Sequence, residues 1–531
     1  MSKRSKKRKQ RQQAEKHKKE AAASSPMKSD AMEQAMRDAL AEKGEELPEK
    51  TSKSFSKSLR DVGKKIFRDN KQDVTSFRPP RPRGADTQFL KRSGQGDVEL
   101  VIGLDFGTSC TKVVIQDIAR QVGYAVPFAP DMQSSGTCLL PTAVKLDAEQ
   151  NFSLFGEGKE FRGLKEHVMS LAFPASDTIG RGKRKDLLPH VYAYLALVFR
   201  EVRAWLMEEH EDKFAGREIL WRVNVGLPAS RFDQRHMNEL YKSIIRRAWY
   251  LSTLNSPINA RSVTTVRQMN VLPANEPGAI GSGAVEAFPE VVAAVQGYAK
   301  SPQRGEGMHL LVDVGATTMD VTCFRLHTYA HQDTYPIFCA AVRHLGGFEL
   351  FNHRARLVED QIVTVMQDYR DGLDGITRPE NPLNLTFALD EEAKEGVDHD
   401  FRNQVGGTIG KVISETRKNG DPRAPEWNST LPLFLIGGAS GIDVYREALS
   451  LIDENPAWRF RLGKKILNLP GNVETPGISP SIRQRLIVAY GLSFNKLDVG
   501  KLIPPSGIPD PEPVLGHPHD EIPDWSKDAV Q

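Results

Sequence analysis

The sequence has no apolar run of about 18 residues, the length that would predict a membrane-spanning helix. Its N-terminus is basic but lacks the apolar segment of a secretory signal. Cysteine is scarce: Cys110, Cys138, Cys323 and Cys339 are scattered and form no Cys-x-x-Cys pair. Such cysteines indicate reduced, buried thiols and argue against a zinc site. These absences predict a soluble cytoplasmic protein.

The first part of the chain has too few acidic residues to balance its basic ones. Residues 1–97 carry a net charge of +12, which leaves −8 for residues 98–531. Residues 3–19 contain ten Lys or Arg and one Glu, and like charges at this density predict disorder. Apolar residues at helical spacing over 32–40 and 55–66 predict two short amphipathic helices. We therefore interpret residues 1–97 as a basic, mostly disordered arm.

Three roles stay open for this arm. It could be a solvated tail, or residues 1–20 could bind nucleic acid, or they could bind an acidic protein or membrane surface. Basic arms bind nucleic acid through phosphates, with steep salt dependence and little sequence preference. The first fifty residues contain no aromatic side chain, which argues against a platform for stacking bases.

Two later stretches share one pattern, in which an apolar strand ends at Asp-x-Gly, hydroxyl residues follow, and a second strand leaves. This pattern predicts β-hairpins, and an ordinary surface hairpin is the alternative interpretation of either one alone. The turn amides and hydroxyls could face an anion, and the acidic residues at the strand ends could face a cation. The first stretch contains Asp105, Gly107, Thr108, Ser109 and Lys112, and the second contains Asp313, Gly315, Ala316, Thr317, Thr318 and Asp320.

A third stretch is an apolar strand, 431–436, that runs into Gly437, Gly438 and Ala439 before a helix-like segment begins at Ile442. A glycine pair between a strand and a helix lets the backbone approach a flat ligand closely. Together, the two hairpins and this turn predict two similar half-domains that close on a nucleotide.

These residues resemble motifs of the superfamily of actins, heat-shock chaperone ATPases and sugar kinases. Asp105-x-Gly107-Thr108-Ser109-x-x-Lys112 is similar to its first phosphate loop. Asp313-x-Gly315-x-Thr317-Thr318-x-Asp320 is similar to its second, especially in plasmid-segregation actins. Ile436-Gly437-Gly438-Ala439 resembles the adenosine motif. The segment with Gly346-Gly347 resembles a chaperone segment, and Val488-Ala489-Tyr490-Gly491 resembles the final hinge helix.

The resemblance implies an α/β fold of two actin-like (ribonuclease-H-like) half-domains with a nucleotide cleft. We expect the first half at 98–300, the second at 301–498, and a Pro-rich tail at 499–531. That tail has seven prolines and no repeated strands. The β-sandwich and helical lid that follow the chaperone ATPase are therefore not expected.

By the same resemblance, ATP and Mg²⁺ are the expected cofactors. Asp105, Asp313 and Asp320 are the expected metal residues, acting through waters because Mg²⁺ keeps much of its hydration shell. Asp105, Asp313 and Glu290 are the expected catalytic residues, and Glu290 would orient the attacking water. Glu286 is the second candidate for that role, and a glutamate that favours a helix N-terminus is the structural alternative for Glu290.

The remaining residues of the three motifs, together with Gly346 and Gly347, are the expected nucleotide contacts. Ala316 stands where the family usually has glycine. A methyl group there is harmless if φ is negative and obstructive if φ is positive. We expect it to be harmless.

Three functions stay open. The first is a chaperone-like ATPase switch that acts through a separate protein partner. The second is an actin-like ATPase that self-associates into filaments, as plasmid-segregation actins do. The third is a small-molecule kinase, for which no sugar-binding signature is found. A nucleotide-binding pseudo-enzyme is a further alternative.

Overall fold

The computed structural model describes residues 96–128, 138–171, 186–214, 216–228, 235–273, 280–355, 391–475, 478 and 480–509. The chain divides into two compact units, 1–69 and 70–531, and every described residue belongs to the second unit. The predictions for the basic arm and its two amphipathic helices therefore lie outside the described residues, as does most of the Pro-rich tail. None of the described helices has the length and apolar character needed to cross a membrane.

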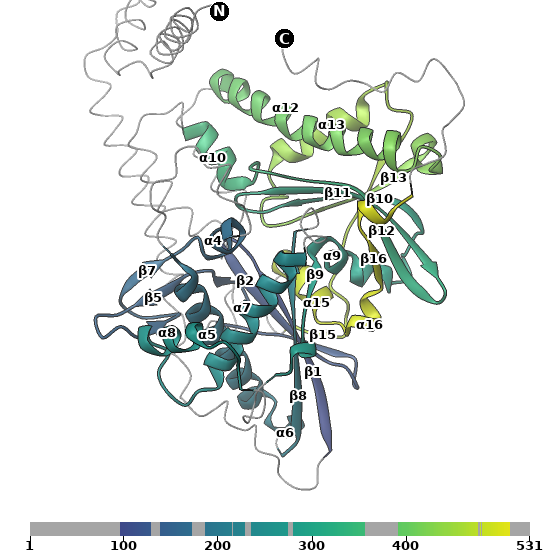
Figure 1. Ribbon diagram of the computed structural model, residues 1–531. Coiled ribbons are helices and arrows are strands. Elements are labelled where there is room, and N and C mark those ends of the chain that lie inside the picture. The colour runs from purple at the N-terminus through teal and green to yellow at the C-terminus, as the bar shows by residue number, and fades with distance from the viewer. Residues whose placement is uncertain are drawn as a thin grey trace, which may run out of the picture. The chain divides into compact units, whose positions relative to one another are not determined.

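Two large mixed sheets dominate the described residues, and both repeat one strand pattern (Figure 1). The first sheet has the order β15-β3-β2-β1-β8-β9, with β4 beside β2, and the second has the order β14-β13-β10-β11-β12-β16. In each, a central strand pairs antiparallel with the next strand of a meander on one side and parallel with a later strand on the other. The fold class is mixed α/β, as expected.

The strands of the first sheet are β1 (Asp97–Phe106), β2 (Cys110–Asp117), β3 (Val122–Ala125), β4 (Leu140–Pro141), β8 (Glu218–Leu227), β9 (Val285–Pro289) and β15 (Val473–Glu474). Those of the second are β10 (Gly307–Val314), β11 (Met319–Tyr329), β12 (Gln332–Arg343), β13 (Thr430–Ile436), β14 (Arg461–Lys465) and β16 (Lys501–Ile503). A small third sheet contains β5 (Val144–Leu146), β6 (Phe152–Ser153) and β7 (Lys159–Phe161).

The described α-helices are α4 (Leu164–Leu171), α5 (Leu188–Glu209), α6 (Glu211–Phe214), α7 (Arg235–Thr253), α8 (Ala260–Gln268), α9 (Glu290–Ala299), α10 (Gly347–Ala355), α12 (Glu391–Glu415), α13 (Asp443–Glu454), α14 (Pro480–Arg485), α15 (Ile487–Leu492) and α16 (Lys496–Val499). The sequence predicts helices over 188–210, 234–250 and 442–451, and these match α5, α7 and α13 closely. It also predicts a loop over 371–399, an acidic stretch with Pro and Asn residues, and this prediction is wrong at its C-terminal end because α12 begins at Glu391.

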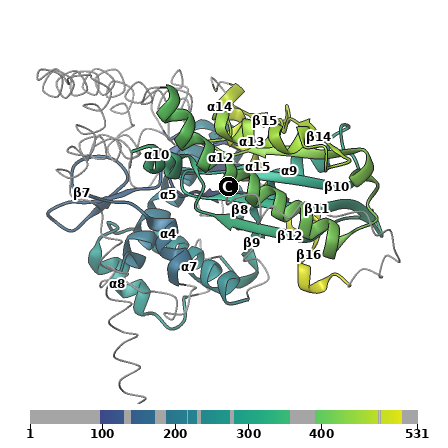
Figure 2. The same ribbon diagram turned by 90° about the horizontal axis from the view of Figure 1, so that it is seen from above.

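Helices cover both faces of the second sheet. Figure 2 shows α12 and α13 lying over β10–β12 on one face, and α12 contacts β11 and β12. On the other face α9 packs through Val291 and Val295 in one apolar cluster with Leu311 and Phe434 of the sheet. A central strand covered on both faces is mostly apolar, which explains the buried run Leu310-Leu311-Val312 in β10.

Helices α9 and α15 lie side by side between the two sheets (Figure 1). Helix α9 directly follows β9, a strand at the edge of the first sheet, but packs on the second sheet. Helix α15 packs on β1, β2 and β8 of the first sheet. The two helices touch at Gly491, where an added Cβ would lie 1.8 Å from the carbonyl oxygen of Ala293. Only glycine allows this approach. The helix pair therefore joins the two sheets.

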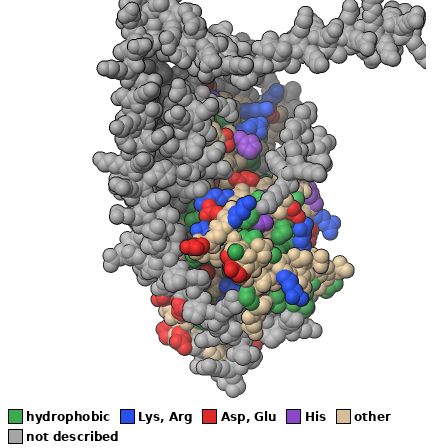
Figure 3. Space-filling view, turned by 90° about the vertical axis from the view of Figure 1, so that its left-hand side faces the viewer, with side chains coloured by type: hydrophobic (Ala, Val, Ile, Leu, Met, Phe, Trp, Pro, Cys, Tyr) green, Lys and Arg blue, Asp and Glu red, His purple; other side chains and the backbone are tan. Residues whose placement is uncertain are grey.

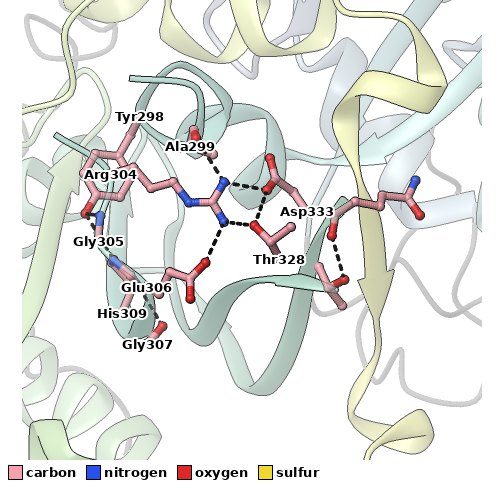
Figure 4. A network of polar contacts seen from close by, with 11 residues as sticks. Tyr298, Ala299, Arg304, Gly305, Glu306, Gly307, His309, Thr328 and Asp333 are labelled. Atoms are coloured by element: carbon pink, nitrogen blue, oxygen red, sulfur yellow. Dashed lines mark hydrogen bonds and ion pairs between the residues drawn. The ribbon is translucent and has the colours of Figure 1, made fainter. Parts of the chain in front are cut away.

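The loop after α9 is fixed to the second sheet by Arg304 (Figure 4). Its guanidinium donates to Thr328 Oγ1 at 2.8 Å, pairs with Asp333, and reaches the carbonyl of Ala299 at the end of α9. The hydroxyl of Tyr298 accepts from Gly305 N at 2.7 Å. These contacts hold the C-terminal end of α9 against the β11–β12 hairpin.

Figure 3 shows one face of the molecule, on which Lys and Arg side chains of the described residues are interspersed with Asp and Glu. Mixed charges of this kind are ordinary for a protein surface. The large excess of positive charge in this protein lies in residues 1–97.

Candidate functional site

One cleft lies where both predicted hairpins and the glycine turn meet. The hairpins form as expected: β1 pairs with β2 around the turn 107–109, and β10 pairs with β11 around 315–318. The predicted site residues that line the cleft are Asp105, Gly107, Thr108, Ser109, Lys112, Glu290, Asp313, Gly315, Ala316, Thr318, Asp320, Gly437 and Gly438.

Four predicted residues, Thr317, Gly346, Gly347 and Ala439, support the cleft rather than line it. The amides of Gly346, Gly347 and Phe348 donate to the carbonyls of Thr317, Gly315 and Ala316, at 3.2, 3.0 and 2.6 Å. Ala439 N donates to the carbonyl of Val314 at 3.0 Å. The carbonyls of the second turn are thus occupied by backbone donors.

The first turn contains an ion pair at its base. Asp105 and Lys112 are register partners across the β1–β2 hairpin, and Lys112 Nζ lies 3.0 Å from Asp105 Oδ2. The two side chains are only 10% and 14% exposed, so solvent screens the pair weakly. The lysine that closes the first motif therefore lies inside the cleft beside its aspartate.

The second turn carries two carboxyls on facing strands. Asp313 and Asp320 are register partners in β10 and β11. Burial, followed by the negative charges of Glu290 and Asp105, raises the pKa of Asp313 to about 7. Burial, followed by the charges of Glu290 and Asp313, raises the pKa of Asp320 well above its usual value. Thr318 Oγ1 donates to Asp320 Oδ2 at 3.4 Å, and Asp320 Oδ1 is buried with no hydrogen-bond partner among the described residues.

Ala316 has the conformation expected for a harmless alanine. The non-glycine residues with positive φ in the described part of the chain are Gln121, Gln150, Ala330 and His331. Ala316 is not among them, so its methyl group causes no backbone strain.

Glu290 lies at the start of α9 and points into the cleft, where Lys165 from α4 donates to its Oε1 at 2.8 Å. Burial alone would lower the pKa of Lys165, but the nearby Glu290 carboxylate holds that pKa above its usual value. Glu286 does not line the cleft and pairs instead with Lys242 and Lys496 at 2.8 and 2.7 Å. The structure therefore separates the two glutamates, and only Glu290 can act in the cleft.

Gly437 closes the cleft from the second sheet and requires glycine. Its φ is +95°, and an added Cβ would lie 2.4 Å from Asp313 Oδ1 and 2.3 Å from the carbonyl oxygen of Val314. The glycine turn therefore packs directly on the strand that carries Asp313. Because the glycines of this turn have no side chains, their backbone can lie directly against a flat ligand.

Sequence reasoning missed several cleft residues. Lys165 has no motif around it, and only the tertiary structure brings it 2.8 Å from Glu290. Gln484 and Arg485 also line the cleft, as do Ile487 and Val488 at the start of α15. Val488 belongs to the hinge motif, which ends at Gly491. That motif could have indicated that the start of α15 faces the cleft.

The charges of the cleft suit a hydrated cation. The cleft lining contains four carboxyl groups, those of Asp105, Glu290, Asp313 and Asp320, and three cationic side chains, those of Lys112, Lys165 and Arg485. No group of three or more His, Cys, Asp or Glu within the described residues is close enough to hold a metal ion by direct ligation. Mg²⁺ commonly binds through one or two carboxylates, water and substrate phosphates. The unpartnered oxygen of Asp320 is a suitable acceptor for a metal-bound water.

No family model matches the chain, and no curated protein matches it.

Proposed function

We propose that this protein is a magnesium-dependent ATPase of the actin-like superfamily, a chaperone-like switch that acts through a separate protein partner. The meeting of the turns 107–109 and 315–318 with Gly437 and Gly438 in one cleft carries the proposal. The equal strand order of the two sheets supports two actin-like, ribonuclease-H-like halves.

A polyphosphate suits the two turns. Backbone amides and the hydroxyls of Thr108 and Ser109 can donate to phosphate oxygens, and each such bond to a charged oxygen contributes about 1.5–3 kcal/mol. Lys112 would neutralise one phosphate oxygen. Asp105, Asp313 and Asp320 would hold Mg²⁺ through its waters. The ion would offset negative charge on the β- and γ-phosphates.

Hydrolysis needs little from the protein beyond a positioned water and charge stabilisation. Glu290 would accept a hydrogen bond from a water in line with the γ-phosphorus, and Lys165 would fix the carboxylate. Because both turns would contact the γ-phosphate, its release would change the equilibrium between open and closed clefts. A ligand shifts such an equilibrium only by its difference in affinity for the two states.

The test is phosphate release from ATP with and without Mg²⁺. Asp313→Ala and Glu290→Ala should each suppress release, whereas Glu286→Ala, which removes a carboxylate outside the cleft, should keep the parent rate. Unchanged hydrolysis in both cleft variants would contradict the proposal. If the parent binds ATP but releases no phosphate, the protein is a nucleotide-binding pseudo-enzyme.

A filament-forming ATPase is the second candidate, and the lysine at position 112 favours it because that spacing is typical of actins. Sedimentation velocity of the full chain separates the two. Large polymers that form only with Mg²⁺ and a non-hydrolysable ATP analogue would support filaments. A particle of monomer mass that sediments slightly faster with nucleotide would support the switch.

A further inference from the structure

The two phosphate-facing turns are held in different ways. The second turn has its carbonyls occupied by three consecutive backbone amides, those of residues 346–348. In the first turn, the carbonyls of Gly107 and Ser109 are both held by Thr142, which directly follows β4. Its amide donates to the carbonyl of Ser109 at 2.7 Å, and its Oγ1 donates to the carbonyl of Gly107 at 2.8 Å.

The surroundings of Thr142 fix the direction of these hydrogen bonds. Its side chain is 1% exposed, and its hydroxyl also lies 3.1 Å from Thr111 Oγ1. A hydroxyl carries one proton. Because Thr142 donates its proton to Gly107, its hydroxyl can only accept from Thr111. Tyr194 donates to the carbonyl of Pro141 at 3.2 Å, which fixes the residue before Thr142.

We infer that Thr142 is a positioning residue for phosphate binding, an inference that rests on the proposed function. A carbonyl oxygen that turns toward a polyphosphate repels it, whereas an amide attracts it. Thr142 holds two carbonyls of the turn, those of Gly107 and Ser109, on the side away from the ligand. With these carbonyls turned away, the turn presents Thr108 and Ser109 to the cleft.

The chain offers a matched set of variants. Thr142→Val keeps the size of the side chain and the amide bond to Ser109 but removes the donor to Gly107. Thr142→Ser restores that donor. Thr111→Val removes a hydroxyl of equal burial from the same network and leaves the bond from Thr142 to Gly107 in place, so it reports the general cost of losing a buried hydroxyl.

The experiment is displacement of a fluorescent ATP analogue from the full chain by ATP, ADP and adenosine, in the presence of Mg²⁺. We expect Thr142→Val to lose about tenfold in affinity for ATP and ADP, the size of effect from one unmade buried hydrogen bond. Its affinity for adenosine should stay at the parent value. Thr142→Ser and Thr111→Val should bind all three ligands as the parent does.

Other outcomes overturn the inference in distinguishable ways. Parent-like ATP affinity in Thr142→Val, or an equal loss in Thr111→Val, means that Thr142 has no positioning role beyond stability. An equal loss for adenosine and ATP means that the effect does not act through the phosphates. If the parent itself binds neither ATP nor ADP, the proposed function fails and the inference fails with it.

Discussion

Lys165 and Glu290 are 125 positions apart in the chain and form an ion pair of 2.8 Å inside the cleft. Their side chains are 12% and 16% exposed. The pair joins α4 to the first residue of α9, the helix that packs on the second sheet. A buried carboxylate held in one orientation by a cation is suited to positioning a water.

Replacement of Lys165 by Met should therefore slow phosphate release, by about 100-fold if the ammonium also faces charge that develops in the transition state. Lys213→Met is the control, because Lys213 pairs with Glu474 at 3.2 Å outside the cleft. Steady-state phosphate release measures both. Equal rates for the two variants would show that Lys165 has no part in hydrolysis.

Gly437→Ala should abolish nucleotide binding. The substitution forces an L-residue to φ +95° and places a methyl group 2.4 Å from Asp313 Oδ1. Gly441→Ala, in the same loop, meets nothing within 4 Å and should bind as the parent does. Calorimetric titration with Mg·ATP compares them, and binding by Gly437→Ala would refute the arrangement of this turn.

His309 should make stability depend on pH. It is fully buried, stacked against Phe324 and Phe434, and burial lowers its pKa to about 4 from the usual 6.5. The unfolded state takes up a proton below pH 6.5, whereas the folded state does so only near pH 4. Stability from this group is therefore complete above pH 6.5 and falls as the pH drops.

The loss amounts to about 3 kcal/mol at pH 4. Urea unfolding between pH 4 and 7 measures this loss. The free energy of unfolding should fall with decreasing pH along a steeper slope in the parent than in His309→Phe. His399→Gln, at a side chain that is 55% exposed, should keep the parent slope. An identical pH dependence for His309→Phe would contradict the prediction.

The β11–β12 turn carries strain that substitution should relieve. Ala330 and His331 have φ of +49° and +64°, the pair of positive values of a type I′ turn. His331→Gly should stabilise the protein by about 1 kcal/mol, the cost of left-handed backbone at a non-glycine residue. His327→Gly, in the extended part of β11, should destabilise it. Urea midpoints give both, and destabilisation by His331→Gly would contradict the assignment of strain.

Deletion of residues 1–20 tests the arm, and this prediction comes from the sequence alone. If the basic segment binds nucleic acid, the full chain should bind DNA or RNA with an affinity that falls steeply with salt. The deletion should remove this binding and leave the cleft unchanged. Fluorescence anisotropy over a salt series measures it, and equal binding by the shortened chain would refute the role.

Local patterns in the sequence determined much of the described fold. An apolar run that stops at Asp105 or Asp313 and resumes after a turn is a short-range signal, so both hairpins were predictable. The strand before Gly437 and the helices α5, α7 and α13 have equally local periodicity. The charge of residues 1–97 is likewise a property of composition alone.

Only the tertiary structure decided which residues share the cleft. Lys165 lies on α4 and meets Glu290 because the chain folds back over 125 positions, a contact that no spacing encodes. The choice between Glu286 and Glu290 depended on which end of β9 faces the cleft. The bonds from Thr142 to the first turn depended on β4 pairing beside β2. Such contacts arise because side chains distant in sequence are brought together by packing of sheets and helices, which periodicity within one segment does not specify.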